Sequence, residues 1–361
     1  MDDKEQKFKT YRSLSNMHNF RLRLFAEGIL TGILAGIVIS FFRFALSEME
    51  YLRGALYNRL WVSDWSINAC WFAVLIAIAF ILHKLNCIEP MAAGSGIPQV
   101  KGAILGLMKM RWLHILWVKL TAGIIGIGAG LSLGREGPSI QLGAVTAQGV
   151  SRLMGRTRME ERYLLTSGAS AGLAAAFNAP LAGVIFALEE LHRNFSIMVL
   201  LPSMAAAFTA TIISRAIFGR ATIFDIPYLQ LLPISYYGIV ILVALASGLA
   251  GVIFNWGLLN IGRFYSLPCF KRPVQKIAFA LICAGILGYF LPEVLGGGND
   301  LINHLATCIV TASADFSCRQ ADFYAHQLRL RRSRRFLPAD ARYRRSLRQH
   351  LRPDADYAWL D

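Results

Sequence analysis

The sequence is poor in charged residues. Of its 361 residues, 16% are charged and 55% are hydrophobic. Soluble domains average about 25% charged and about 45–50% apolar residues. A water-soluble fold cannot bury so large an apolar excess, because its surface must remain in contact with water. The composition therefore excludes an ordinary soluble enzyme and indicates a protein that sits in a membrane.

Motifs for metal binding and disulfide bonding are also lacking. The six cysteines are scattered and none forms a CxxC pair, while the seven histidines show neither HxxxH nor HExxH spacing. Zinc sites and redox dithiols depend on such spacings. We therefore expect no metal and no cofactor, and we interpret the cysteines as small apolar residues.

We expect no secretory signal in the N-terminal region. The first 20 residues are polar, and Arg21 and Arg23 directly precede an apolar run that is too long for a signal peptide. Basic residues before a first membrane span favour the cytoplasmic side. We therefore expect residues 1–20 to be a cytoplasmic N-terminal segment.

Long apolar runs are abundant, and several approach the ~20 residues that cross a bilayer as a helix. The runs are Leu22–Leu46, Ile67–Leu85, Trp112–Leu133, Ser196–Phe218, Tyr236–Leu259 and Ile277–Leu295. The 31 glycines suit close helix packing in lipid. The sequence predicts an all-α, polytopic transmembrane protein.

Three short strings of glycine, proline and polar residues interrupt this apolar sequence, at 94–98, 134–138 and 178–180. Proline fits the first turn of a helix but breaks its interior. Each string therefore predicts a helix start or break within the membrane region. Irregular backbone is tolerated at that depth only where protein buries it or where it lines a cavity.

Two of these strings favour anion binding. A helix N-terminus presents unpaired N–H groups and about half a positive charge, and adjacent glycines allow an ion to approach the backbone. Two such ends that face one another hold an anion without a full counter-charge, which permits release. The alternative is that both strings are plain interhelical turns. The candidate residues are Gly94, Ser95, Gly96, Ile97, Pro98, Gly134, Arg135, Glu136, Gly137 and Pro138.

Glu136 is an ionisable residue in an apolar part of the chain. Burying a carboxylate costs several kcal/mol unless it is paired or solvated, so such residues are functional candidates. At the mouth of an anion site it can occupy the site as a tethered anion, and its protonation would release it. The alternative is a salt bridge with the adjacent Arg135.

Glu189 and Glu190 end the apolar segment that follows the third string. Carboxylates often carry protons through transporters, so this pair is a candidate proton relay. The alternative is a solvated helix end beside His192 and Arg193.

The three strings together resemble the CLC family of chloride channels and proton-coupled chloride transporters. The matching residues read GSGIP at 94–98, GREGP at 134–138 and AAAFNAPLAGVIFALEE at 174–190. The similarity in pattern predicts a CLC-type membrane domain over residues 21–303.

The resemblance implies roles for single residues. Ser95 corresponds to the chloride-coordinating serine, Glu136 to the gating glutamate, and Glu190 to the internal proton-transfer glutamate of many exchangers. Because channels of the family carry an apolar residue at the position of Glu190, a proton/chloride exchanger is favoured over a passive voltage-gated channel of the same fold.

The resemblance also implies an architecture. The family fold consists of two inverted helical repeats, and its members are homodimers with one pore per subunit. We therefore expect a multi-pass transporter, not an enzyme, whose partners are chloride ions, protons and the lipid bilayer. In a bacterium it would lie in the plasma (inner) membrane.

The chain departs from the family after the glycines at 296–298. The expected apolar helices do not follow, and from Asp315 onward the chain carries eleven arginines, six aspartates and no lysine. The second repeat is thus begun but incomplete. We expect the Arg-rich tail, residues 304–361, not to fold as in the family.

One hypothesis for the origin of this tail is a change of reading frame. Residues 329–339 can be encoded so that reading one base later yields GSGAPGGFFLP, which resembles the missing family string. The alternative is a genuine tail that binds anionic headgroups. Nucleic acid is not an expected partner, because nothing else in the chain supports nucleic-acid binding. Under the frame-change hypothesis the chain as written would be an inactive membrane fragment with little chloride flux, since half of the anion site would be missing.

We predict that resequencing the codons for Asn299 to Asp361 reveals a one-base change, located between Asn303 and Asp315. The restored frame should encode the Gly-rich string and further apolar helices. A confirmed frame with no such string hidden in it would show that the Arg-rich tail is genuine.

Overall fold

The computed structural model describes residues 17–193, 195–219, 234 and 237–297. All of them belong to the first of the two units into which the chain divides, Met1–Ala306. Most of the predicted N-terminal segment 1–20 and the whole predicted tail 304–361 lie outside the described residues.

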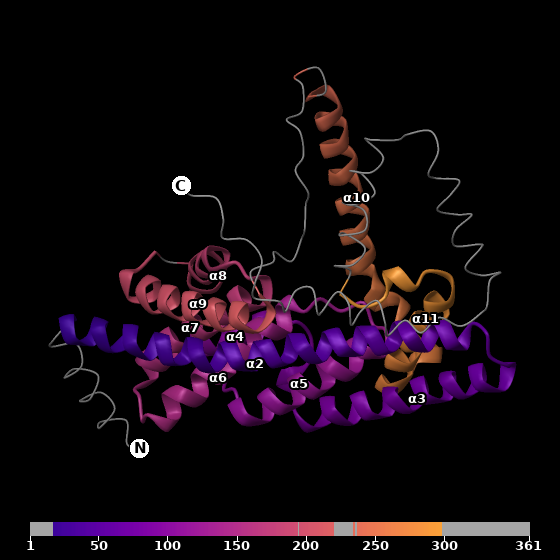
Figure 1. The fold of residues 1–361 in the computed structure, drawn as a ribbon, viewed down its shortest axis with the longest axis horizontal. Helices are drawn as coiled ribbons and strands as arrows, with labels where there is room; N and C mark the ends of the chain where they lie inside the picture. Colours follow the sequence, from indigo (N-terminus) through magenta and orange to yellow (C-terminus); the bar gives the residue numbers. More distant parts are fainter. Residues whose placement is uncertain (1–16, 194, 220–233, 235–236, 298–361) are drawn as a thin grey trace, which may run out of the picture. The chain divides into compact units, whose positions relative to one another are not determined.

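The described residues form helices and helical turns, with no strand among them, which confirms the predicted all-α class (Figure 1). In chain order they are α2 (Met17–Leu60), α3 (Trp65–Ile88), η1 (Pro90–Ala92), α4 (Ile97–Ile104), α5 (Trp112–Gly128), α6 (Glu136–Leu153), α7 (Arg158–Phe177), α8 (Pro180–Phe186), η2 (Ala187–His192), α9 (Ile197–Phe218), α10 (Tyr237–Phe264), η4 (Pro268–Phe270), α11 (Pro273–Phe290) and η5 (Pro292–Val294).

Five of these helices, α2, α3, α9, α10 and α11, are long and apolar enough to cross a membrane. The apolar run Trp112–Leu133 does not form a helix over its whole length, because α5 ends at Gly128. Gly130 has φ +107°, a conformation that favours glycine and turns the chain out of the helix.

Helix α2 continues well beyond the apolar run Leu22–Leu46, to Leu60. Its polar second half is held by backbone groups of other segments. Arg53 donates to the carbonyl oxygens of Ile127 at 2.8 Å and Leu295 at 3.2 Å, and Glu50 accepts from the amide of Gly297 at 3.1 Å. These bonds satisfy charged groups that hydropathy alone would place outside a span.

Helices α6 and α7 are the main elements that hydropathy did not reveal. Both contain serine and threonine, and α6 also contains glutamine, yet protein buries most of their residues. They pack together through glycines: a Cβ at Gly143 would overlap the carbonyl oxygen of Gly168, and one at Gly168 would overlap Ala147. Some buried hydroxyls bond within their own helix, as Thr146 does to the Leu142 carbonyl at 2.8 Å. Small residues thus replace apolar bulk as the packing surface.

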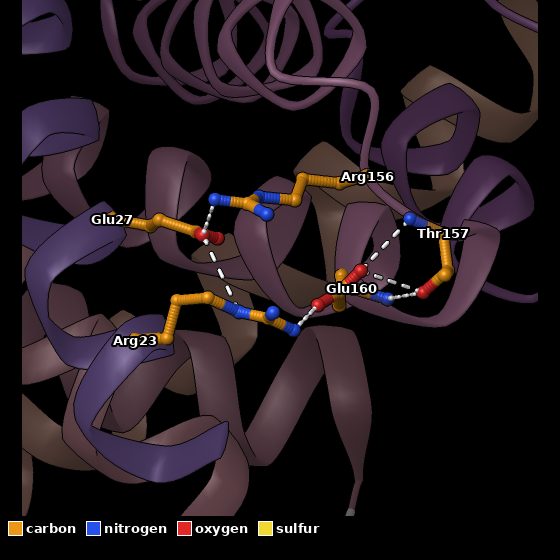
Figure 2. A network of polar contacts seen from close by, with 5 residues as sticks. All are labelled: Arg23, Glu27, Arg156, Thr157 and Glu160. Atoms are coloured by element: carbon orange, nitrogen blue, oxygen red, sulfur yellow. Dashed lines mark hydrogen bonds and ion pairs between the residues drawn. The ribbon is translucent and has the colours of Figure 1, made fainter. Parts of the chain in front are cut away.

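A cluster of charged side chains fastens the start of α2 to the turn between α6 and α7 (Figure 2). Arg23 pairs with Glu27 and Glu160, and Arg156 pairs with Glu27 at 2.6 Å. Thr157 caps α7 and donates from its hydroxyl to Glu160 at 2.8 Å. Glu27 and Glu160 are buried, so the two arginines are needed to offset the cost of removing both carboxylates from water.

Helix α10 differs from α6 and α7 in its exposure. The described part of the chain buries none of its residues. Its glycines, such as Gly248, have open space where a Cβ would lie.

We predict that Gly168→Leu destabilises the protein, because the new side chain would force α6 and α7 apart. Overpacking of this kind costs about 1–3 kcal/mol or more in unfolding free energy. Gly248→Leu is the matched control and should leave stability unchanged. Unfolding midpoints in detergent give the comparison, and equal midpoints for the two variants would contradict the packing seen between α6 and α7.

Candidate anion-binding site

The string at 94–98 forms the start of α4, as predicted. Gly96 is the N-cap residue and has φ +89°, a backbone conformation that residues with a side chain rarely adopt. Pro98 lies in the first turn, where its missing N–H costs nothing. Gln99 donates to the carbonyl oxygen of Ala93 at 2.9 Å and closes the loop on itself.

The string at 134–138 forms the start of α6, which begins at Glu136 with Arg135 as its N-cap. The hydroxyl of Ser139 donates to the Arg135 carbonyl at 2.7 Å. The third predicted break is present too, since α7 ends at Phe177, Asn178 is left-handed with φ 58°, and α8 begins at Pro180.

The starts of α4 and α6 touch. A Cβ at Gly137 would lie 2.6 Å from the Ser95 carbonyl oxygen, and a Cβ at Gly96 would lie 2.6 Å from the Cβ of Gln141. Only glycines allow this approach. Gln141 also donates to the Met91 carbonyl at 2.8 Å, which ties α6 to the segment before α4.

Both helix starts line one cavity of about 610 Å³. Seven of the ten candidate residues are on its wall: Gly94, Ser95, Ile97, Gly134, Glu136, Gly137 and Pro138. Gly96, Pro98 and Arg135 are not on the wall. The structure therefore brings together two strings that lie about 40 positions apart in the sequence.

Lys119, from α5, completes the wall and was missed by the sequence analysis. Its side chain is only 5% exposed. The ammonium donates to the carbonyl oxygens of Ala92 at 3.0 Å and Gly94 at 2.5 Å, and no carboxylate of the described residues lies within ion-pair distance. The cavity thus carries a buried positive charge that carbonyl dipoles only partly offset. The signal was present in the sequence as a lone lysine within an apolar run.

Glu136 is half-buried on the same wall as Ser95, next to Gly134. Its carboxylate therefore stands at the start of a helix, where the helix dipole favours a negative charge. A carboxylate and an incoming anion would compete for the same positive region.

Glu189 and Glu190 lie outside this cavity, in the π-helical turn η2, and both are exposed. The side chain of Glu190 pairs with Lys101 of α4, with 2.9 Å between Oε1 and Nζ. The hydrogen bond from Lys101 holds the pKa of Glu190 below its usual range. Within the described residues, no group of three His, Cys, Asp or Glu side chains is placed to hold a metal ion.

Comparison with known proteins is consistent with this geometry. The family model described as "Voltage gated chloride channel" matches residues 72–317. The H(+)/Cl(-) exchange transporter ClcA of Vibrio cholerae is 33% identical over 288 residues, which cover 76% of this chain and 60% of that protein. The ClcA protein of Salmonella arizonae is 34% identical over 296 residues, covering 78% of this chain and 61% of that protein. The chain thus spans about 60% of the length of these relatives.

Solved structures show the same fold. A slow cyanobacterial Cl-/H+ antiporter superimposes with a TM-score of 0.68 at 31% identity, covering 77% of this chain and 66% of that one. A CLC-type fluoride/proton antiporter superimposes with a TM-score of 0.62 at 24% identity, covering 82% of this chain and 71% of that one. The chain therefore belongs to the CLC family, whose family model carries the description voltage gated chloride channel.

Proposed function

We propose that this chain serves proton-coupled chloride exchange across a membrane. Chloride is held in the cavity between the starts of α4 and α6, and Glu136 gates access to it. The family relationship supports the class of function, since the relatives named above are H(+)/Cl(-) exchange transporters.

The observation that carries the proposal is the convergence of positive potential on one cavity. Two helix N-termini, each worth about half a positive charge, line it together with the ammonium of Lys119. A site of this kind attracts a monovalent anion. Because the helix ends supply only partial charges and Lys119 also bonds to carbonyls, the anion is not held too tightly to leave. The hydroxyl of Ser95 adds a neutral donor on the same wall.

Glu136 has the position that gating requires. Its carboxylate lies on the wall of the cavity and at the N-terminus of α6, so in the charged form it competes with chloride for the same positive region. A proton neutralises it and removes that competition. This exclusion links proton binding at Glu136 to chloride entry.

Glu190 is proposed as the internal proton-transfer residue. Its exposure makes it accessible, and its separation from the cavity keeps the proton route apart from the anion at this point. A carboxylate here favours exchange over passive conduction. We further propose that the N-terminus is cytoplasmic, that the chain works as a homodimer, and that in a bacterium it lies in the plasma (inner) membrane.

The first prediction concerns Glu136→Gln. The amide keeps the shape of a protonated glutamate and cannot become a tethered anion, so chloride flux should continue while proton movement stops. Chloride and pH electrodes outside liposomes measure both fluxes. If resequencing reveals the frame change, the liposomes contain the protein made from the restored frame, because the frame-change hypothesis expects little flux from the chain as written. The wild-type protein should move protons against chloride, and Ser95→Ala should weaken chloride flux without uncoupling it.

Two results would contradict the proposal. Chloride flux that never drives proton movement in the wild-type protein would identify a passive channel. Absence of flux together with absence of chloride binding would identify a fragment that does not transport.

The second prediction concerns Lys119→Met. Removing the ammonium takes away the buried positive charge and leaves the Ala92 and Gly94 carbonyls without their donor. Because the anion would lose the attraction of this charge, chloride affinity should fall about tenfold or more, which corresponds to about 1.4 kcal/mol of binding free energy.

Calorimetric titration of the purified protein with chloride measures this affinity. Lys119→Arg should retain most of it, and the exposed Lys109→Met is the matched control that should leave it unchanged. Equal affinity in Lys119→Met and wild-type protein would remove Lys119 from the site.

A further inference from the structure

Helix α4 takes part in two separate polar arrangements. Its start contributes to the anion cavity, and Lys101, near its other end, pairs with Glu190 of η2. Lys101 and Glu190 are 89 positions apart in the sequence, and the hydrogen bond between them joins α4 to η2. About half of the Glu190 side chain remains exposed, against about a quarter of Lys101.

Lys101 is the main charge that faces Glu190 from the neighbouring elements. The segments packed against η2 are α4, α7, α8 and α9. Helix α8 has no charged residue, and the one charged residue of α9, Arg215, donates instead to Asn178 at 2.7 Å. Arg162 of α7 faces His192.

The remaining titratable groups belong to η2 itself or to the face of α7 beside it. They are Glu189, His192 and the adjacent Arg193, together with Tyr163, whose ring stacks on His192. Thr166 lies within hydrogen-bond distance of His192 as well. Burial and the nearby Arg162 lower the pKa of His192. This histidine is therefore mostly neutral near pH 7 and does not replace Lys101 as a cation for Glu190.

We propose that Lys101 controls proton uptake at Glu190, because its ammonium forms an ion pair with the carboxylate and so stabilises the charged form over the protonated one. This inference rests on the proposed function, in which Glu190 is the internal proton-transfer residue. Lys101 is a positioning residue in this scheme: it touches neither chloride nor Glu136, and it acts through Glu190 alone.

The direction of the effect follows from the charges. The hydrogen bond from Lys101 and then its Coulombic attraction lower the pKa of Glu190, with a smaller contribution from Arg193. A carboxyl group with a lowered pKa takes up its proton only at lower pH. Removal of Lys101 should therefore allow protonation at higher pH. Because the pair is partly exposed, added salt should weaken it in the same direction.

Infrared titration of the carboxyl band in the full-length protein tests the proposal, with Glu190→Gln used to identify the band. Lys101→Met should move the titration midpoint of Glu190 to higher pH. Lys101→Arg should keep the wild-type midpoint, and Lys109→Met, at an exposed lysine beyond the end of α4, is the matched control. For wild-type protein the midpoint should rise when salt is raised, a measurement that depends on no variant folding.

A midpoint that changes neither in Lys101→Met nor with salt would overturn the proposal. Proton flux in liposomes separates this failure from failure of the proposed function. With both proposals correct, Lys101→Met shifts the pH profile of proton flux upward, and the shift vanishes in the Glu190→Gln background. If Lys101→Met moves the titration midpoint but Glu190→Gln leaves proton flux unchanged, the control by Lys101 is supported and the transport role of Glu190 is refuted.

Discussion

The site depends on one constraint, which is that backbone N–H groups at a helix start cannot be left unpaired in an apolar layer. Each such group costs several kcal/mol when it faces hydrocarbon. The starts of α4 and α6 meet this constraint by opening into a shared cavity rather than into lipid. The same groups that would be a liability in the membrane then become the ligands available to an anion.

The convergence of the two starts requires close packing around them. Gly96 and Gly137 allow α4 and α6 to touch, and the glycine contacts between α6 and α7 allow α6 to sit deep in the protein. Lys119 supplies the remaining tie, since its ammonium holds the backbone of the loop before α4. Backbone geometry and charge are therefore built by the same few residues, and a change in any of them alters both.

Much of this was predictable from the sequence, for identifiable reasons. Proline and glycine restrict the backbone locally, so the strings at 94–98 and 134–138 indicated helix starts without any knowledge of the fold. Hydropathy located helices that are long and apolar enough to cross a membrane, such as α3 and α10. It did not reveal α6 and α7, because helices surrounded by protein need small residues rather than apolar ones.

The relations between distant residues were less accessible. Lys119 was visible as a lone charge in an apolar run, but only the fold shows that its ammonium reaches the loop at Gly94. The pairing of Lys101 with Glu190 had no signal in either local sequence, since it depends on how α4 lies against η2. Patterns of spacing describe one element at a time, whereas a site is assembled from several.

The charged cluster at the start of α2 has a consequence for the order of assembly (Figure 2). Arg23 and Glu160 are 137 positions apart, so Arg23 and Glu27 leave the ribosome long before Arg156 and Glu160 exist. At about 5–20 residues per second, the gap lasts on the order of ten seconds. During that time the first span must keep its two charged side chains at a water-facing edge. The start of α2 can move into the protein interior only after the turn between α6 and α7 has been made, which sets a sequence of events for biogenesis.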